Sequence, residues 1–114
     1  MNVEEFSKEW IDAWNSHNLE RILSHYSEDF EIVTPMIKIA MGIDTGALIG
    51  KKSVRDYWST ALQKFPDLHF ELKNVTEGID SVAICYESSL GKIVIEVMFF
   101  DHHGKINKAY VHYS

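Results

Sequence analysis

The sequence is poor in cysteine and proline, with one of the first and two of the second. Because Cys85 is alone, no internal disulfide can form, and its place in a strand-like apolar run predicts a buried structural thiol. The six histidines show none of the spacings that zinc sites use. Nucleophile motifs and a glycine-rich phosphate loop are absent too, so we expect neither a metal nor a cofactor.

Basic clusters and long apolar runs are also lacking. There are 11 Lys and Arg against 17 Asp and Glu, and no basic cluster that could neutralise a run of phosphates, which argues against nucleic acid as a partner. No apolar run approaches the roughly 20 residues of a membrane-spanning helix. The N-terminal MNVEEFSKEW is acidic and amphipathic, unlike a signal peptide. We therefore expect no membrane partner and a cytoplasmic location.

The length and the hydrophobic content of the sequence are those of a small globular protein. The 114 residues fit one domain, 1–114, without a linker. Hydrophobic residues make up 46% of the chain and include three Trp, five Tyr and six Phe. Since each large ring can bury roughly 150–250 Å², a core is expected even in so short a chain.

Three helices are predicted from apolar residues three and four positions apart. The first helix, with Asn2 and Glu5 as a capping pair, has one apolar face made of Val3, Phe6, Trp10, Ala13 and Trp14. The second is short, is capped by Asn18 and carries Leu19, Ile22, Leu23 and Tyr26. The third has Ser53 and Asp56 in capping positions and carries Val54, Tyr57, Trp58, Ala61, Leu62 and Phe65.

The segment between Pro35 and Gly50 is apolar but shows no clean period. It holds three glycines together with Met36, Ile37, Ile39 and Met41, which would be poor choices for a solvated loop. Segments of this length without regular structure tend to be functional flaps. We therefore expect it to fold over something.

Strands follow from a period of two. A short strand over Phe30–Thr34 is ended by Pro35. After the third helix, four strands are predicted, at Leu68–Lys73, Val82–Glu87, Ile93–Phe100 and Ile106–Tyr113. Helices first and antiparallel strands afterwards give an α+β class.

The strand Ile93–Phe100 is apolar on both faces, with Glu96 as its only polar residue. Such a strand is buried on both sides. The helices can cover one face, but little chain remains to cover the other. The sequence therefore predicts a homodimer through the outer face of the sheet.

Positions spread along nearly the whole chain carry a family resemblance. They are Trp10 with the run Ala13–Leu19, the run Tyr26–Phe30, Pro35, Gly50 and Lys51, the run Val54–Trp58, the run Pro66–Leu68 with Phe70, Asp101, Gly104 and Lys105, and His112 with Tyr113. On these residues the sequence resembles the nuclear transport factor 2-like (NTF2-like) superfamily, and within it the SnoaL-like branch.

The resemblance implies a cystatin-like cone, in which the three helices pack on a strongly curved, mostly antiparallel sheet and leave an internal pocket. Members of the superfamily include isomerases, epoxide hydrolases, dehydratases, polyketide cyclases and proteins without chemistry, so the fold alone does not fix the function. In ketosteroid isomerase relatives a base precedes a proline. Here that position is Thr34, the position of their first-helix tyrosine is Trp10, and the position of their acid is Glu96.

Glu96 and His112 are the candidate catalytic residues. Glu96 shares a strand face with Val94, Met98 and Phe100, where desolvation should raise the pKa of its carboxyl. His112 lies on the last strand with Tyr110 on its face. If the two side chains face each other across a cavity, they could shuttle protons, because imidazole titrates near neutrality. Pairing of Glu96 with a buried donor is the structural alternative.

Further residues are candidates for binding a ligand. Aromatic side chains on the helix faces offer flat apolar area with N–H and O–H groups, although they could equally be plain core. The candidate ligand-binding residues are Trp10, Trp14, Thr34, Met36, Tyr57, Trp58, Met98 and Tyr110.

Three functions are compatible with this pattern. The first is binding of a small apolar, cyclic or aromatic molecule in the cone. The second is an isomerase, polyketide cyclase or dehydratase that uses Glu96 and His112 as acid and base. The third is a protein-interaction module that uses the sheet face.

Overall fold

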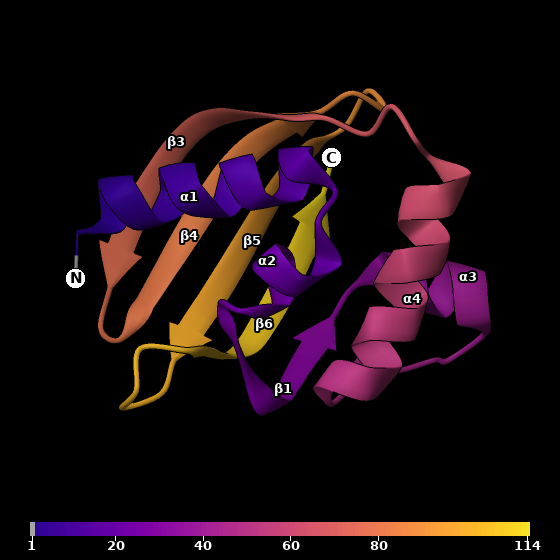
Figure 1. The fold of residues 1–114 in the computed structure, drawn as a ribbon, viewed down its shortest axis with the longest axis horizontal. Helices are drawn as coiled ribbons and strands as arrows, with labels where there is room; N and C mark the ends of the chain where they lie inside the picture. Colours follow the sequence, from indigo (N-terminus) through magenta and orange to yellow (C-terminus); the bar gives the residue numbers. More distant parts are fainter. Residues whose placement is uncertain (1) are drawn as a thin grey trace.

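A computed structural model describes residues 2–114, which form four helices and six strands (Figure 1). The helices are α1 (Val3–Ser16), α2 (Leu19–Leu23), α3 (Pro35–Met41) and α4 (Lys51–Lys64). The strands are β1 (Tyr26–Val33), β2 (Ala47–Ile49), β3 (Phe70–Gly78), β4 (Ser81–Ser88), β5 (Ile93–Phe100) and β6 (Ile106–Tyr113).

All six strands belong to one sheet, in the order β2-β1-β6-β5-β4-β3. Every neighbouring pair is antiparallel except β1 and β6, which are parallel. Helix α1 packs on β3, and α4 packs on β1 at the other end of the sheet (Figure 1). The predicted α+β class with a mostly antiparallel sheet is therefore confirmed.

Helix α1 forms as its sequence pattern predicts. The Asn2 side chain accepts a hydrogen bond from the Glu5 N–H at 3.0 Å, which satisfies one of the free donors of the first turn. Trp10, Ala13 and Trp14 of the predicted face are buried against the sheet. The apolar spacing thus fixed the side of the helix that the core covers.

The joint after α1 attaches the helix to the edge of the sheet. His17 ends α1 with a left-handed backbone (φ 59°), and its Nε2 lies 2.6 Å from the Leu68 carbonyl oxygen. The Asn15 side chain accepts from the Phe70 N–H at 2.7 Å and donates to the Phe70 carbonyl at 2.9 Å. These bonds satisfy backbone groups at the start of the edge strand β3 that no further strand could pair with.

The segment after β1 differs from its prediction. We expected an irregular flap, but Pro35–Met41 is helical, so the described chain has four helices rather than three. Thr34 caps the helix by accepting from the Met36 N–H at 3.2 Å, Pro35 occupies the first turn, and Gly42 ends it with φ 70°. Seven residues are too few to show a helical period beside three glycines.

Other element boundaries also differ from those predicted. Strand β1 begins at Tyr26, which we had assigned to the second helix. Helix α4 begins at Lys51 after Gly50 and has no side-chain cap, so the predicted caps Ser53 and Asp56 lie inside it. Local patterns define element ends poorly because one or two residues there satisfy either state.

Strand β5 has the predicted apolar residues on both faces. Val94, Glu96 and Met98 point toward the helices and are buried. On the outer face Ile93 and Ile95 are 41% and 44% exposed. Cys85, paired with Ile95 on this outer face, is only half-buried, so the prediction of a buried thiol was wrong.

None of the described helices has the length and apolar character that crossing a membrane requires.

Candidate functional site

The centre of the candidate site is Glu96, in the middle of β5. Its side chain points to the helix side of the sheet and is 7% exposed. Its neighbours along and across the strands on that face are apolar: Val94, Met98, Ile84 and Val111. The structure therefore places a carboxyl group inside an apolar layer, as the alternation along β5 predicts.

One hydrogen bond holds this carboxyl. The Tyr86 hydroxyl lies 2.5 Å from Glu96 Oε1, and the structure provides no second hydrogen bond to this carboxyl from residues 2–114. Burial raises the pKa of Glu96 to about 7, and the hydrogen bond from Tyr86 acts in the opposite direction. Because an ordinary Glu titrates near pH 4.5, Glu96 is unusual in exchanging its proton near neutrality.

Other phenol groups surround Glu96. Burial, followed by the charge of Glu96, raises the pKa of Tyr26, Tyr57 and Tyr113. Tyr26 is fully buried and accepts a hydrogen bond from the Trp10 indole N–H at 3.0 Å. The Trp14 N–H approaches the same hydroxyl but makes no well-formed hydrogen bond. Among residues 2–114, Glu96 is thus the one buried carboxylate, and it lies in a layer of hydroxyl and N–H groups.

The tryptophans predicted to bind a ligand lie in the core. Trp14 and Trp58 meet edge to face at 4.8 Å, and Trp10 stacks on Phe70 at 6.2 Å. Trp10 and Met98 are fully buried. Aromatic rings therefore fill the space between helices and sheet where we expected a pocket, and the hollow lies elsewhere.

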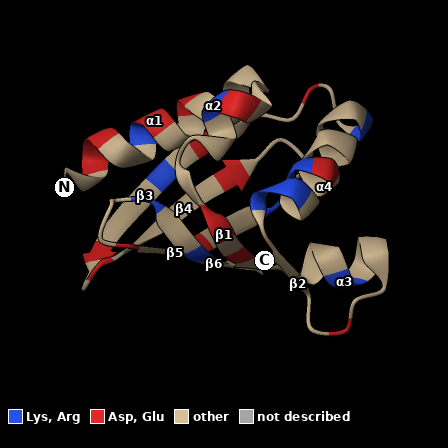
Figure 2. Cartoon of the chain, turned by 60° about the horizontal axis from the view of Figure 1, so that its bottom comes forward, with Lys and Arg blue, Asp and Glu red and all other residues tan. Residues whose placement is uncertain are grey.

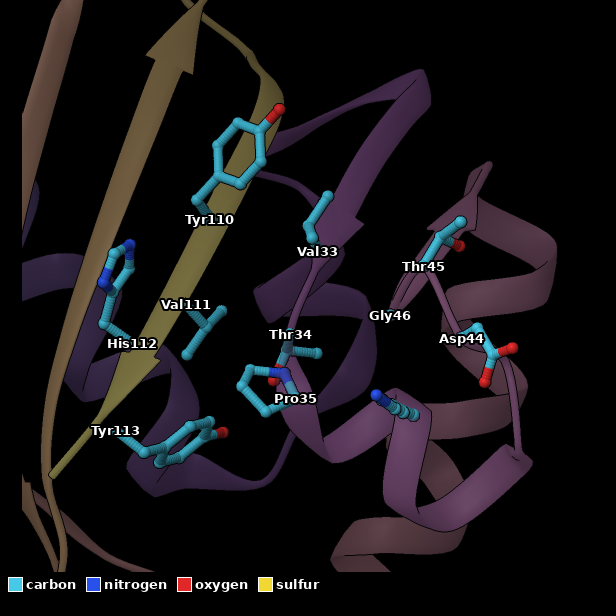
Figure 3. Close-up of a pocket in the computed structure, with 11 residues that line it drawn as sticks. Val33, Thr34, Pro35, Asp44, Thr45, Gly46, Tyr110, Val111, His112 and Tyr113 are labelled. Atoms are coloured by element: carbon cyan, nitrogen blue, oxygen red, sulfur yellow. The ribbon is translucent and has the colours of Figure 1, made fainter.

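A groove opens at the edge of β6, and we call it the β6 groove. Its volume is about 480 Å³, within the size range of small-molecule sites. Figure 3 shows the side chains that line it. They are Val33, Thr34, Pro35, Lys38, Asp44, Thr45, Gly46, Tyr110, Val111, His112 and Tyr113.

The groove exists because β1 is shorter than β6 at this end. The last paired residue of β1, Val33, lies beside Tyr110, and β6 continues for three more residues. Thr34 and Pro35 then lead the chain away into α3. The edge of β6 beyond Tyr110 is consequently not covered by a neighbouring strand.

The far wall of the groove is fixed by a close backbone contact. The Thr34 N–H donates to the Gly46 carbonyl at 2.9 Å. Gly46 has φ 68°, and a Cβ atom there would lie 2.8 Å from the Thr34 carbonyl oxygen. Only glycine fits both this backbone conformation and this spacing.

The groove and Glu96 are close neighbours. Val111, on the groove floor, is the direct partner of Glu96 across the β5–β6 ladder. Tyr113 lies on the same face of β6, is 39% exposed and is close enough for the charge of Glu96 to raise the pKa of its hydroxyl. Val111 and Tyr113 therefore lie next to Glu96 and also line the groove.

His112 does not face Glu96. It pairs with Ile95, whereas Glu96 pairs with Val111, so His112 lies on the outer face and is exposed. The predicted pair of Glu96 and His112 across a cavity is wrong for this reason. His112 and Tyr110 instead form the outer rim of the β6 groove (Figure 3).

The other predicted ligand-binding residues lie in the groove wall, near Glu96 or on α3. Thr34 is in the groove wall, Tyr57 is half-buried near Glu96, and Met36 lies on α3 with 37% exposure. Sequence reasoning missed Tyr86 and Tyr113. Their signal was the period of two, which puts each on the inner face of its strand. No cluster of His, Cys, Asp and Glu suited to a metal ion occurs within residues 2–114.

The profile of the SnoaL-like domain matches residues 7–105 of this chain. The chain belongs to the SnoaL-like domain family. This domain is 47% identical to a SnoaL-like protein of unknown function from Burkholderia thailandensis, whose crystal structure superposes with a TM-score of 0.96 over 97% of this chain and 92% of that one.

More distant structures share the fold of this SnoaL-like domain. A cystatin-fold protein from Novosphingobium aromaticivorans is 18% identical, with a TM-score of 0.79 over 98% of each chain. SalBIII, described as an epoxide hydrolase/cyclase-like enzyme of pyran ring formation in salinomycin, is 19% identical, with a TM-score of 0.74 over 97% of this chain and 89% of that one. No match to this chain is found among curated proteins. The predicted cystatin-like, NTF2-like fold is thereby confirmed.

Proposed function

We propose that this SnoaL-like domain binds a small cyclic or aromatic molecule next to Glu96 and exchanges a proton with it. The observation that carries the proposal is the carboxyl of Glu96, buried among apolar side chains and held by one hydrogen bond from Tyr86. A purely structural position in this layer would be filled at lower cost by an apolar residue. A carboxyl of this kind is a candidate for acid–base chemistry.

The chemistry follows from the protonation of Glu96. With a pKa of about 7, the carboxyl is populated both as acid and as base at neutral pH. Tyr86 holds one of its oxygens and leaves the other for a bound molecule. Proton removal next to a carbonyl group gives an enolate. An isomerase returns the proton to another carbon, a cyclase of the aldol type adds the enolate to a second carbonyl, and a dehydratase expels water from it.

The β6 groove is the proposed route to Glu96. The Tyr113 side chain lines the groove, lies near Glu96 and is 39% exposed. A rotation of this side chain would join the groove to the carboxyl. Trp10, Trp14, Trp58 and Met98 then act as the apolar wall behind the site rather than as its lining.

The test is exchange of carbon-bound protons. Cyclic and aromatic ketones are incubated with the protein in D₂O, and loss of the proton next to the carbonyl is followed by NMR. The wild-type protein should accelerate exchange of at least one ketone, and Glu96→Gln should abolish the acceleration. Glu87→Gln, the same change at an exposed position of β4, is the matched control and should retain it. Equal exchange by wild type and Glu96→Gln would reject Glu96 as the acid–base group.

We also propose a homodimer through the outer face of the sheet. Its support is a set of exposed apolar side chains on β5 and β6, Ile93, Ile95, Phe99 and Tyr110, each 36–44% exposed. Such a patch on a small protein favours association. The same face would serve a different protein partner if the chain were an interaction module. The cytoplasmic location stays a prediction.

A further inference from the structure

We infer that the β6 groove binds a carboxylate group of the ligand and that the Lys38 ammonium is its anchor. The inference rests on the proposed function and names its substrate class: a small aromatic or cyclic carboxylic acid. Its ring would lie toward Glu96 and its carboxylate in the groove.

The groove combines apolar and aromatic walls with few charges. Val33, Pro35 and Val111 supply apolar surface, and Tyr110 and Tyr113 supply rings (Figure 3). This surface suits the flat face of a small ring.

In the described part of the chain, Lys38 is the one Lys or Arg side chain that lines the groove. It lies on α3, which ends before the loop that holds Asp44, and Figure 2 shows α3 and the loop after it at one end of the molecule. Within residues 2–114 no carboxylate oxygen lies within 4.0 Å of its ammonium group. Asp44 also lines the groove, but its carboxylate is turned away from β6 (Figure 3). Lys38 is therefore free to pair with an anion that enters.

The backbone of β6 supplies a second donor. The Ser114 N–H donates to the Ile93 carbonyl at 2.9 Å, so the backbone groups of Ser114 and His112 point toward β5. Because backbone groups alternate along an antiparallel strand, those of Tyr113 point the other way, into the groove. Strand β1 has ended by that point, so the Tyr113 N–H has no partner strand. An ammonium and a backbone N–H are a common pair of donors for a carboxylate.

Two threonine hydroxyls of the groove accept hydrogen bonds from backbone N–H groups. Thr34 Oγ1 accepts from the Met36 N–H at 3.2 Å, and Thr45 Oγ1 accepts from the Ala47 N–H at 3.4 Å. Their O–H groups can donate to a neutral carbonyl as well as to a carboxylate, so neither threonine selects for charge. The charge of Lys38 is thus the feature of the groove that distinguishes an acid from a neutral molecule of the same shape.

The experiment compares 2-naphthoate with 2-naphthamide, which have the same ring and differ in charge. Binding to the full chain is measured by tryptophan fluorescence and calorimetry. Wild type should bind the naphthoate about two- to fivefold more tightly than the naphthamide, because Lys38 is exposed. Lys38→Gln should remove this difference and leave the naphthamide affinity unchanged. Lys52→Gln, an exposed position on α4 with the same change of charge, should keep the difference.

The outcomes separate this inference from the proposed function. If wild type binds both probes equally, or Lys38→Gln keeps the preference for the acid, the inference fails while ketone exchange through Glu96 still stands. If neither probe binds and no ketone is exchanged, both fail. Thermal unfolding of Lys38→Gln checks that the variant is folded.

Discussion

At Glu96, burial and a hydrogen bond act on one carboxyl group in opposite directions. Burial dominates, so the folded protein holds the Glu96 proton up to about pH 7, whereas the unfolded chain releases it near pH 4.5. The stability linked to this proton is complete below about pH 4.5 and is lost as the pH rises through about 7. Glu96 therefore lowers the stability of the folded protein above neutral pH, and its carboxyl titrates near neutrality.

Glu96→Gln should remove this pH dependence. At pH 8 the variant should be more stable than wild type by on the order of 3 kcal/mol, because it avoids burying a charge. At pH 4 the two should be nearly equal. Urea unfolding at several pH values gives the unfolding free energies of wild type and Glu96→Gln. The other titrating groups are the same in both proteins, so their contributions cancel in the difference. A constant difference across the range would contradict a raised pKa of Glu96.

Tyr86→Phe should raise the pKa of Glu96 further, because the lost hydrogen bond favours the charged form. The readout is the ¹³C chemical shift of the Glu96 carboxyl during a pH titration. Tyr110→Phe, on the outer face, should leave the midpoint unchanged. A midpoint that falls in Tyr86→Phe would show that the phenol stabilises the neutral form instead.

Among the elements, the end of α1 and the start of β3 are joined by one side chain. Asn15 satisfies both the N–H and the carbonyl of Phe70, as a neighbouring strand would. The wall of the β6 groove depends on a comparable contact, the close approach of Gly46 to Thr34. Both contacts hold loops in place where the sheet itself offers no partner.

Asn15→Ala should destabilise the protein by about 2 kcal/mol, since two part-buried backbone groups of Phe70 lose their partner. Chemical unfolding gives the loss, and faster hydrogen exchange of the Phe70 amide locates it. Asn107→Ala, at an exposed position of β6, should change stability by less than about 0.5 kcal/mol. Equal losses in the two variants would refute the role of Asn15.

Gly46→Ala and Gly42→Ala form a matched pair, because both positions have φ near 70° but only Gly46 lacks room for a Cβ atom. Gly42→Ala should cost about 1 kcal/mol from its backbone alone. Gly46→Ala should cost at least about 1 kcal/mol more, and it should weaken binding of 2-naphthoate because the groove wall moves. Similar unfolding free energies for both variants would show that the wall adapts freely.

For the whole molecule, the two faces of the sheet differ in the side chains that they carry. The inner face carries Glu96 and the aromatic core, and the outer face carries exposed isoleucine and phenylalanine side chains that we assign to a dimer. The β6 groove lies at an edge, where residues of both faces meet. Binding at the groove and association through the outer face could therefore influence each other through Tyr110 and His112.

Ile95→Glu should convert the proposed dimer to a monomer, because each copy would place a carboxylate in an apolar interface. Light scattering after size-exclusion chromatography measures the mass. Gln63→Glu, an exposed change of the same charge on α4, should remain dimeric. A wild-type protein that runs as a monomer at high concentration would remove the dimer proposal.

Much of the fold was predictable because it is encoded locally. Trp10, Ala13 and Trp14 recur at helical spacing. The alternation along β5 places Glu96 and Ile95 on opposite faces of the sheet, whichever strands pair with β5. Helix α3 was missed because Pro35–Met41 is too short to show a period. The false pairing of Glu96 with His112 has another cause: the register of β6 on β5 includes a shift at Phe99 and Phe100 that no local pattern reports.

The sequence by itself determined the α+β class, the apolar faces of α1 and α4 and the inward side of Glu96, because these depend on periods within single segments. Only the tertiary structure decided that Tyr86 holds Glu96, that rings fill the interior and that the hollow lies at the β6 edge. Those features depend on which strands pair, in which register and where each one stops. Long-range packing sets all three.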